Sequence, residues 1–295
     1  MARLFDAYVM VDWSAAAKPS TGADSIWIGV LKRNVRFQLA FSATNPSTRA
    51  EAEAQLGALL EDFIKRNERA LIGFDFPLSF TRGTAKALKL AEPAWDSLGK
   101  WVEHEIKDKP DNSNNRFQTA AKMNRLMTGE AFPFWGCPAR DEQTTLRAKR
   151  PRDHLETDLP EMRLADGAAK GAQSIWKLYY QGSVGGQALT GIPVVRRLRK
   201  RFANSRLWPF ETGWKALVPA DLDGVGAVLC EIWPSMLKAQ AGPGEVKDLA
   251  QVRTLAEHFA ALDEKSRLSA LFGPAKGQTA SAEIVEQEEG WILGA

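Results

Sequence analysis

The order of apolar and polar residues predicts strands and a helix in the first eighty residues. Short apolar runs at residues 8–11 and 70–74 are typical of buried strands. Residues 25–31 form another run, rich in Ile and Trp, and residues 32–34 are expected to be a tight turn. Residues 35–41 alternate between apolar and polar, which is typical of a strand with one exposed face.

A helix is predicted between the third and fourth of these strands. Thr48 and Glu51 have the spacing of a capping box, in which two side chains satisfy free backbone N–H groups at a helix start. The element order is therefore expected to be β-β-β-α-β. Five apolar residues at helical spacing would face the sheet. They are Ala52, Leu56, Leu59, Leu60 and Phe63.

The rest of the chain divides into a helical middle and an α/β end. Residues 81–212 carry mostly helical patterns interrupted by polar loops. Residues 225–232 predict a buried strand, and residues 248–262 predict an amphipathic helix. Because the strands at both chain ends are expected to share one sheet, we predict a single α/β core made of residues 1–80 and 213–295, with residues 81–212 as a mainly helical insertion.

Composition narrows the class of protein. An apolar fraction of 44% and a charged fraction of 25% are ordinary for a globular chain, and a net charge of +3 permits a polyanionic ligand without requiring one. Asp6 interrupts the N-terminus before a signal-peptide apolar stretch can form, and no apolar run reaches the length of a transmembrane helix. Cys137 and Cys230 are too few for a disulfide framework or a zinc site. We therefore expect a cytoplasmic protein without a membrane partner, and its oligomeric state stays open.

Three acidic residues lie at the ends of predicted strands. Asp12 and Asp75 each follow an apolar run directly, and Glu231 lies at the end of a third. A helical crossover makes the first and fourth strands parallel neighbours, and open α/β sheets bind ligands at the carboxyl ends of such strands. We expect the three carboxylates to meet there and to hold Mg²⁺ or Mn²⁺, which prefer oxygen ligands. Taken singly, each acid is equally well explained as a cap or turn residue.

Four motifs spread over most of the chain resemble those of a known family. They are Val11-Asp12-Trp13-Ser14, Gly73-Phe74-Asp75-Phe76-Pro77-Leu78, Glu231-Ile232-Trp233-Pro234-Ser235 and Glu288-Glu289-Gly290-Trp291-Ile292-Leu293. Together they are similar to a bacterial family of uncharacterised, predicted RuvC-like nucleases. The resemblance implies a ribonuclease H-like α/β core with the order β-β-β-α-β-α-β-α, a mixed five-stranded sheet and a large helical insertion.

The same resemblance implies a reaction. Nucleases of this kind hydrolyse phosphodiester bonds with two metal ions, so the implied partner is a nucleic acid or another phosphoester. By this resemblance Asp12 contacts both ions, while Asp75 and Glu231 hold one ion each. A fourth acid from a C-terminal helix usually completes such sites.

The fourth acid is the least clear part of the resemblance. Glu288 and Glu289 lie beside Gly290 at an expected helix end, where negative charge needs a neutralising partner. We therefore take Glu289 as the fourth catalytic candidate. Asp248 is better explained as a helix N-cap, with Gln251 placed to reach back to it.

Candidate substrate contacts lie near a glycine-rich stretch and a basic run. Residues 182–191 could cradle a phosphate or form a flexible insertion loop, and they match no nucleotide-binding fingerprint. Residues 196–201 could neutralise a nucleic-acid backbone or form a solvated helix face. The candidates are Lys177, Gln187, Thr190, Arg196 and Arg197.

Two other functions stay open at this point. Actin-like ATPases and sugar kinases share the implied fold and place an Asp and small residues after the first strand, as Asp12 and the following Trp-Ser-Ala-Ala do here. Those enzymes need a second copy of the fold, and the sequence shows no internal repeat. A catalytically inactive protein that binds nucleotide or nucleic acid is the other alternative, because the fourth acid is not obvious.

Overall fold

The computed structural model describes residues 3–295 and contains a mixed six-stranded sheet. The strand order is β3-β2-β1-β4-β6-β5. The strands β3, β2 and β1 pair antiparallel, whereas β1, β4, β6 and β5 run parallel to one another. The bounds are β1 (Ala7–Asp12), β2 (Trp27–Arg33), β3 (Leu39–Thr44), β4 (Ala70–Phe74), β5 (Ser205–Leu207) and β6 (Ala227–Glu231).

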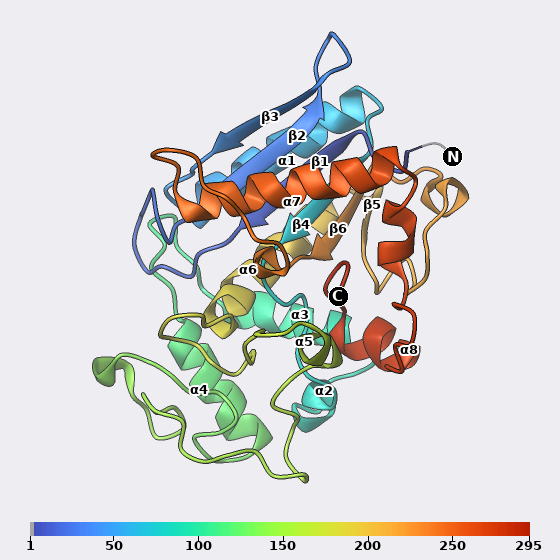
Figure 1. Ribbon diagram of the computed structural model, residues 1–295. Coiled ribbons are helices and arrows are strands. Elements are labelled where there is room, and N and C mark those ends of the chain that lie inside the picture. The colour runs from blue at the N-terminus through green and yellow to red at the C-terminus, as the bar shows by residue number, and fades with distance from the viewer. Residues whose placement is uncertain (1–2) are drawn as a thin grey trace.

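Helices cover both faces of this sheet (Figure 1). Helix α7 (Lys247–Glu264) packs on one face, and α1 (Arg49–Lys65) and α6 (Gly185–Arg201) pack on the other. Among residues 3–295, no helix combines the length and the apolar character needed to cross a membrane. The other helices are α2 (Thr84–Ala87), α3 (Ala94–Glu105), α4 (Arg116–Met127), α5 (Leu164–Ala168) and α8 (Ala282–Ile284), with short 3-10 or π-helical turns at Ala139–Asp141, Pro219–Leu222, Pro234–Met236, Leu268–Phe272 and Val285–Glu289.

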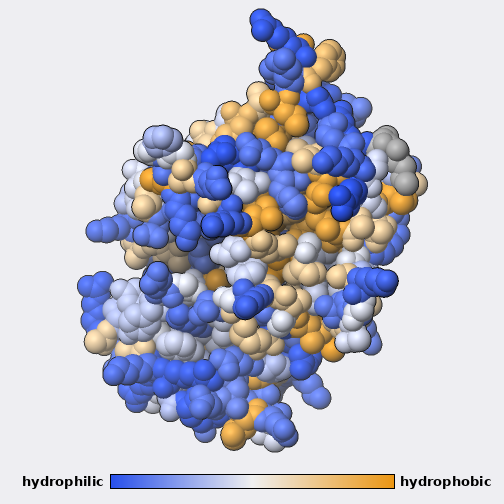
Figure 2. All heavy atoms as spheres, in the orientation of Figure 1, coloured by the Kyte–Doolittle hydropathy of each residue, from blue (hydrophilic) through white to orange (hydrophobic). Residues whose placement is uncertain are grey.

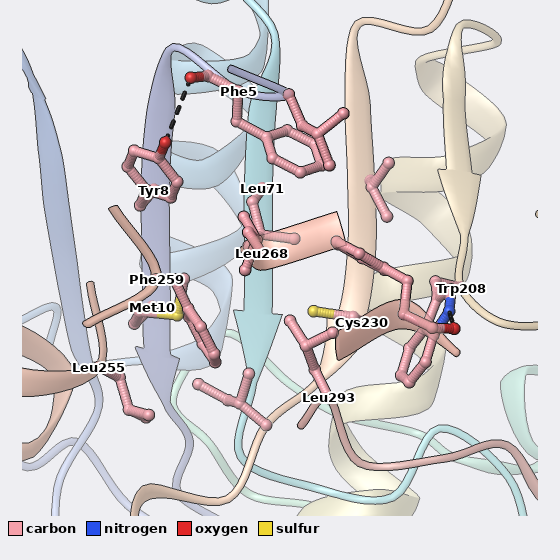
Figure 3. Packing of buried hydrophobic residues seen from close by; sticks show 14 of the residues in the cluster. Phe5, Tyr8, Met10, Leu71, Trp208, Cys230, Leu255, Phe259, Leu268 and Leu293 are labelled. Carbon is pink, nitrogen blue, oxygen red and sulfur yellow. Dashed lines mark hydrogen bonds between the residues drawn. The ribbon is translucent and has the colours of Figure 1, made fainter. Parts of the chain in front are cut away.

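The packing of α7 sets the position of its first turn. Met10 of β1 lies in one buried cluster with Leu255 and Phe259 of α7 (Figure 3). The Tyr8 hydroxyl, at the start of β1, donates to the Asp263 carboxylate near the end of α7 at 2.7 Å. Since the beginning of the strand contacts the end of the helix, α7 runs back along β1. The first turn of α7 therefore lies near the C-terminal end of β1.

Helix α1 confirms the predicted apolar face and most of the predicted cap. The Thr48 hydroxyl oxygen accepts a hydrogen bond from the Glu51 backbone N–H at 3.2 Å. The Glu51 carboxylate accepts from the Ser47 backbone N–H at 2.8 Å, one residue before the position that a capping box predicts. Of the five apolar residues, Leu59 is only partly buried. The fully buried ones are Ala52, Leu56, Leu60 and Phe63.

The sheet is larger than the five strands that the resemblance implies. Strand β5 pairs in parallel with β6, and it lies within residues 81–212. Helix α6, from the same segment, packs against the sheet through Val194, Val195 and Leu198. Part of the expected insertion therefore belongs to the sheet layers. Helices α2, α3 and α4 of that segment share a separate buried cluster, whereas Ala165 of α5 belongs to the cluster beneath α7. The division into a core and an insertion stays a prediction.

The hairpin between β2 and β3 differs from the sequence prediction. Strand β2 continues through Arg33, so the turn expected at residues 32–34 is wrong, and the chain reverses over residues 34–38. Val35 and Phe37 lie in this turn with 96% and 80% of their surface exposed. Their alternation with polar residues is therefore not the pattern of a strand.

Candidate active site

Asp12 and Asp75 meet at the C-terminal ends of two neighbouring parallel strands. Asp12 ends β1 and Asp75 follows β4, and the register pairs Val11 with Phe74 immediately before them. The two carboxyl groups share a hydrogen bond, and the Trp13 backbone N–H donates to Asp75 Oδ1 at 2.7 Å. The contact predicted from the two apolar runs is therefore present in the structure.

The two carboxyl groups resist losing both protons. Burial raises the pKa of Asp12 well above its usual range, and the neighbouring Asp75 raises it further. Burial raises the pKa of Asp75 to about 6, although the hydrogen bonds from Asp12 and Trp13 oppose this rise. Two acids this close ionise fully only when something compensates their charge, either a shared proton or a cation.

Asp248 and Asp24 add two more carboxylates to the same place. All four aspartates line one cleft of about 730 Å³, and Asp248 and Asp24 both raise the pKa of Asp12. The Asp24 backbone N–H donates to Asp248 Oδ2 at 2.7 Å. Figure 2 shows the surface hollowed between the part of the molecule that holds α7 and the part that holds α4.

The predicted capping role of Asp248 is wrong. The cap position of α7 is Val246, and Asp248 lies two residues further on, inside the first turn. At that position its side chain lines the cleft, and burial raises its pKa. An acid from the last long helix therefore reaches the site, but it is not Glu289.

Glu231 lies one residue short of the aspartates in the sheet register. Phe74 pairs with both Val11 and Glu231, so these three residues form one row, and Asp12 and Asp75 belong to the next. Successive side chains of a strand point to opposite faces. Val11 and Phe74 face α1 and α6, so the strand geometry directs Glu231 away from the face that α7 covers.

Glu231 belongs instead to a buried ion-pair network. Arg163 donates to both carboxylate oxygens of Glu231 at 2.6 Å and to Asp166 at 2.7 Å, and only 1% of the Arg163 side chain is exposed. Burial raises the pKa of Glu231, and the Arg163 guanidinium opposes the rise. Glu231 is not among the residues that line the cleft. The structure does not bring it to Asp12 and Asp75.

Glu289 is also committed elsewhere. Its side chain is fully buried and accepts from the backbone N–H groups of Arg82 at 2.8 Å and Leu164 at 2.5 Å. The neighbouring Glu288 accepts from the Gly83 backbone N–H at 2.7 Å. These bonds tie the C-terminal turn to the segment before α2 and to the first residue of α5. Neither glutamate lines the cleft.

Of the predicted substrate contacts, Gln187 lines the cleft. Its side-chain amide donates to the Trp13 backbone carbonyl at 2.6 Å, and the Thr190 hydroxyl accepts from the Trp13 indole N–H at 3.3 Å. Both therefore hold the loop after β1 against α6. Lys177 donates to the Gln181 carbonyl at 2.8 Å and does not line the cleft.

The predicted phosphate-binding arginines are paired with acids. Arg196 is 8% exposed and contacts Asp96 at 3.0 Å and Glu103 at 3.2 Å. Arg197 pairs with Glu53 at 2.6 Å. The basic run therefore ties α6 to α1 and α3, and the structure does not place these two arginines at the cleft.

Most of the glycine-rich stretch is helical and is not a flexible loop. Residues from Gly185 onward form the first turns of α6. A Cβ at Gly185 would lie 2.2 Å from the Ile175 carbonyl oxygen, and a Cβ at Gly191 would lie 2.2 Å from the Phe76 ring. These glycines allow close packing, and the residues of the stretch that line the cleft are Gly182, Ser183, Val184 and Gln187.

The donor set of the cleft fits a hard divalent cation. Asp12, Asp75, Asp248 and Asp24 offer only oxygen atoms, and no His or Cys from residues 3–295 lines the cleft. Within that same range, no group of three or more His, Cys, Asp or Glu side chains is already gathered as a metal site. Comparisons of the chain with protein families, with curated proteins and with solved structures found no match.

Proposed function

We propose that the chain is a divalent-metal-dependent phosphodiester hydrolase of the nuclease type, built on a ribonuclease H-like core. Three antiparallel strands followed by a crossover helix and two parallel strands, with α7 returning over the sheet, support that fold. Strand β5 adds to it at one edge. The proposal keeps the reaction that the motif resemblance implies and changes the residues that perform it.

The observation that carries the proposal is that Asp12, Asp75 and Asp248 line one cleft, where burial raises the pKa of each. We assign the metal-holding role to these three residues and take Mg²⁺ or Mn²⁺ as the ion. When bound, such ions neutralise the charge that develops on phosphoryl oxygens and lower the pKa of an attacking water. Asp24 borders the site, and Glu231 and Glu289 have no role in the reaction.

The protein's own groups hold these carboxylates in place. The Trp13 backbone N–H fixes Asp75 at 2.7 Å, and the Asp24 backbone N–H fixes Asp248 at 2.7 Å. Both donors belong to the segment between β1 and β2, so one loop orients acids from β4 and α7. The proton between Asp12 and Asp75 must leave before a cation can take its place, which links cation binding to pH.

The test is nuclease activity on single-stranded and duplex DNA and RNA with Mn²⁺. We expect the wild type to cleave at least one substrate, and Asp12→Asn and Asp248→Asn to lose about 100-fold or more, because each removes an anionic ligand. Asp153→Asn is the matched control, since the Asp153 side chain is 94% exposed and does not line the cleft.

Three outcomes contradict parts of this proposal. Equal activity of the wild type and Asp12→Asn would remove the carboxylate cluster from the mechanism. Loss of activity in a well-folded Glu231→Gln variant, with Asp248→Asn unaffected, would restore the site that the motif resemblance implies. Cation binding without turnover of any phosphoester would identify a non-catalytic binding protein.

A further inference from the structure

Arg116 is a buried cation without an anionic partner in the cleft wall. It is the first residue of α4, is 7% exposed and lines the same cleft as the aspartates. Its Nη1 donates to Asn114 Oδ1 at 3.0 Å, but its Nε has no hydrogen-bond partner, and no carboxylate within residues 3–295 forms an ion pair with it. A buried charge is costly unless it is paired. The missing partner is therefore expected to be an anion that enters the cleft.

The start of α6 adds a second feature that favours an anion. A Cβ placed on Gly186 would lie 3.4 Å from Arg116 Nε and 3.2 Å from the Ala15 Cβ, so the first turn of this long helix touches both Arg116 and the loop after Asp12. The N-terminal end of a helix carries partial positive charge and free N–H groups. Burial lowers the pKa of Arg116 to about 10, and the nearby Arg49 lowers it further, so the guanidinium stays charged at neutral pH.

Two tyrosines form an exposed aromatic wall beside this cation. Tyr179 and Tyr180 are 40% and 49% exposed, line the cleft, and have ring centroids 4.9 Å apart. Phe117, on which the Arg116 guanidinium lies at 4.3 Å, packs edge-on against the Tyr179 ring. Tyr180 has a φ of 74°, which is unfavourable for a bulky residue. Exposed aromatic rings beside a cation are the usual surface for stacking nucleobases.

The size and charge of the cleft favour a single strand over a duplex. A volume of about 730 Å³ is in the range of pockets that enclose one small ligand, whereas a duplex needs a long basic surface along its backbone. The basic run of α6 does not supply that surface, because Arg196 and Arg197 are held by acids. An unpaired nucleotide can present both its base and its phosphate inside such a cleft.

From these observations we infer that the wall formed by Arg116, Tyr179, Tyr180 and the first turn of α6 is a binding site for single-stranded nucleic acid. Arg116 takes a phosphate through its guanidinium, with the N-terminus of α6 beside it, and Tyr180 stacks on the adjacent base. This inference rests on the proposed function for the identity of the ligand as substrate, but the binding itself needs no metal.

The test is fluorescence anisotropy of a labelled oligothymidylate with wild type and variants in EDTA, which prevents cleavage. We expect Tyr180→Ala and Arg116→Ala each to raise Kd by roughly 5- to 100-fold, the range for losing one stacked base or one charged contact. Tyr180→Phe should keep the wild-type Kd, because the ring is retained. Arg197→Ala is the matched control and should stay within about twofold of the wild type, because its guanidinium is already paired.

Each result decides the inference separately from the nuclease proposal. Unchanged Kd in Tyr180→Ala would overturn it, and this exposed side chain can be removed even if Arg116→Ala does not fold. Duplex binding as tight as single-strand binding would also overturn it. Tight single-strand binding with no hydrolysis in Mn²⁺ would support the inference and contradict the nuclease proposal. Hydrolysis that is unaffected by substitution of Arg116 or Tyr180 would support the nuclease proposal and contradict the inference.

Discussion

At Asp12, the cost of burying charge should appear as a pH dependence of stability. Because burial raises the folded-state pKa of Asp12 and raises that of Asp75 to about 6, the native state binds more protons than the unfolded chain from about pH 4 up to at least about pH 6. The free energy of unfolding therefore falls as pH rises through this window. We expect Asp12→Asn to match the wild type at the acid end and to exceed its stability near neutral pH, because the asparagine side chain carries no charge that burial would penalise.

Thermal unfolding in EDTA across this pH range measures the difference. Asp153→Asn serves as the control, since its exposed side chain should leave the pH dependence of the wild type unchanged. Parallel stability curves for the wild type and Asp12→Asn would show that the pair ionises without penalty. The shared proton would then be absent.

A divalent cation should offset the loss of stability that comes from ionising Asp12 and Asp75 near neutral pH. At saturating Mn²⁺ and neutral pH, we expect the melting temperature of the wild type to rise by about 5 °C, since a ligand at a hundredfold excess over its Kd adds about 2.7 kcal/mol. The rise should shrink below about pH 6, where Asp75 regains its proton. Differential scanning fluorimetry measures it. An equal rise in Asp12→Asn or Asp248→Asn would place the cation elsewhere.

Glu231 and Asp248 should respond oppositely to substitution. Glu231→Ala leaves Arg163 with only one buried partner and should destabilise the fold by about 3 kcal/mol, because removing one member of a buried ion pair strands the other. Asp248→Asn should change the free energy of unfolding by less than about 1 kcal/mol, because an asparagine oxygen can still accept from the Asp24 backbone N–H. Urea unfolding measures both. Similar losses would show that both acids are structural.

The same residues show what the sequence can and cannot predict of a site. Asp12 and Asp75 directly follow uninterrupted apolar runs, so their strand positions could be inferred and their contact followed from the crossover. The prediction that Glu231 joins them was wrong, because side chains alternate between the two faces of a strand, and a register error of one residue reverses the direction of the side chain. The prediction that Asp248 caps its helix was wrong by two residues, since the cap position of α7 is Val246. No pattern marked Arg116 at all.

At the scale of elements, α6 depends on glycine for its packing. Alanine is normally the better helix residue, by about 1 kcal/mol. A Cβ at Gly191 would nonetheless lie 2.2 Å from the Phe76 ring, which is itself buried against Trp13. We therefore expect Gly191→Ala to destabilise the fold by about 1–3 kcal/mol, because the ring has little space to move. Chemical denaturation measures this.

Gly167→Ala in α5 is the matched control for this prediction. Nothing lies within 4 Å of a Cβ placed there, so the substitution should be neutral or slightly stabilising. A stable Gly191→Ala variant would mean that α6 can shift away from the sheet. In that case Gln187 and the loop after β1 would also lose their fixed position, and single-strand binding should weaken with them.

Helices and strands were predicted correctly where their buried residues form a clear apolar pattern in the sequence, and incorrectly where no such pattern exists. Helix α1 and strands β1 and β4 carry apolar residues on buried faces, and their positions were predicted correctly. Val35 and Phe37 alternate with polar residues as in a strand, but they lie exposed in a turn, so this alternation does not reflect a buried face. Strand β5 has three residues, too few to show any period, and its place in the sheet comes from pairing with β6.

At the scale of the whole molecule, the order of elements allowed the α/β class and the position of the cleft to be inferred. It did not show whether the basic residues bind a ligand or pair with acids of the same chain. The sequence places 39 basic and 36 acidic residues along the chain, and a basic run is equally compatible with binding and with internal pairing. The outcome depends on which acids the fold places opposite that run, and these come from distant helices. Arg197 forms an ion pair with Glu53 of α1, and Lys200 forms one with Glu103 of α3.

This pairing predicts a weak salt dependence of oligonucleotide binding. Each phosphate contact with a single strand contributes about −0.7 to the slope of log K against log salt concentration. With one phosphate contact, from Arg116, we expect a slope near −0.7, whereas five free cations from residues 196–201 would give roughly −3.5. Anisotropy titrations at several salt concentrations measure the slope. A steep slope that Arg197→Ala reduces would show that the ion pairs of α6 open to bind the backbone, and the strand would then cross α6 instead of entering the cleft.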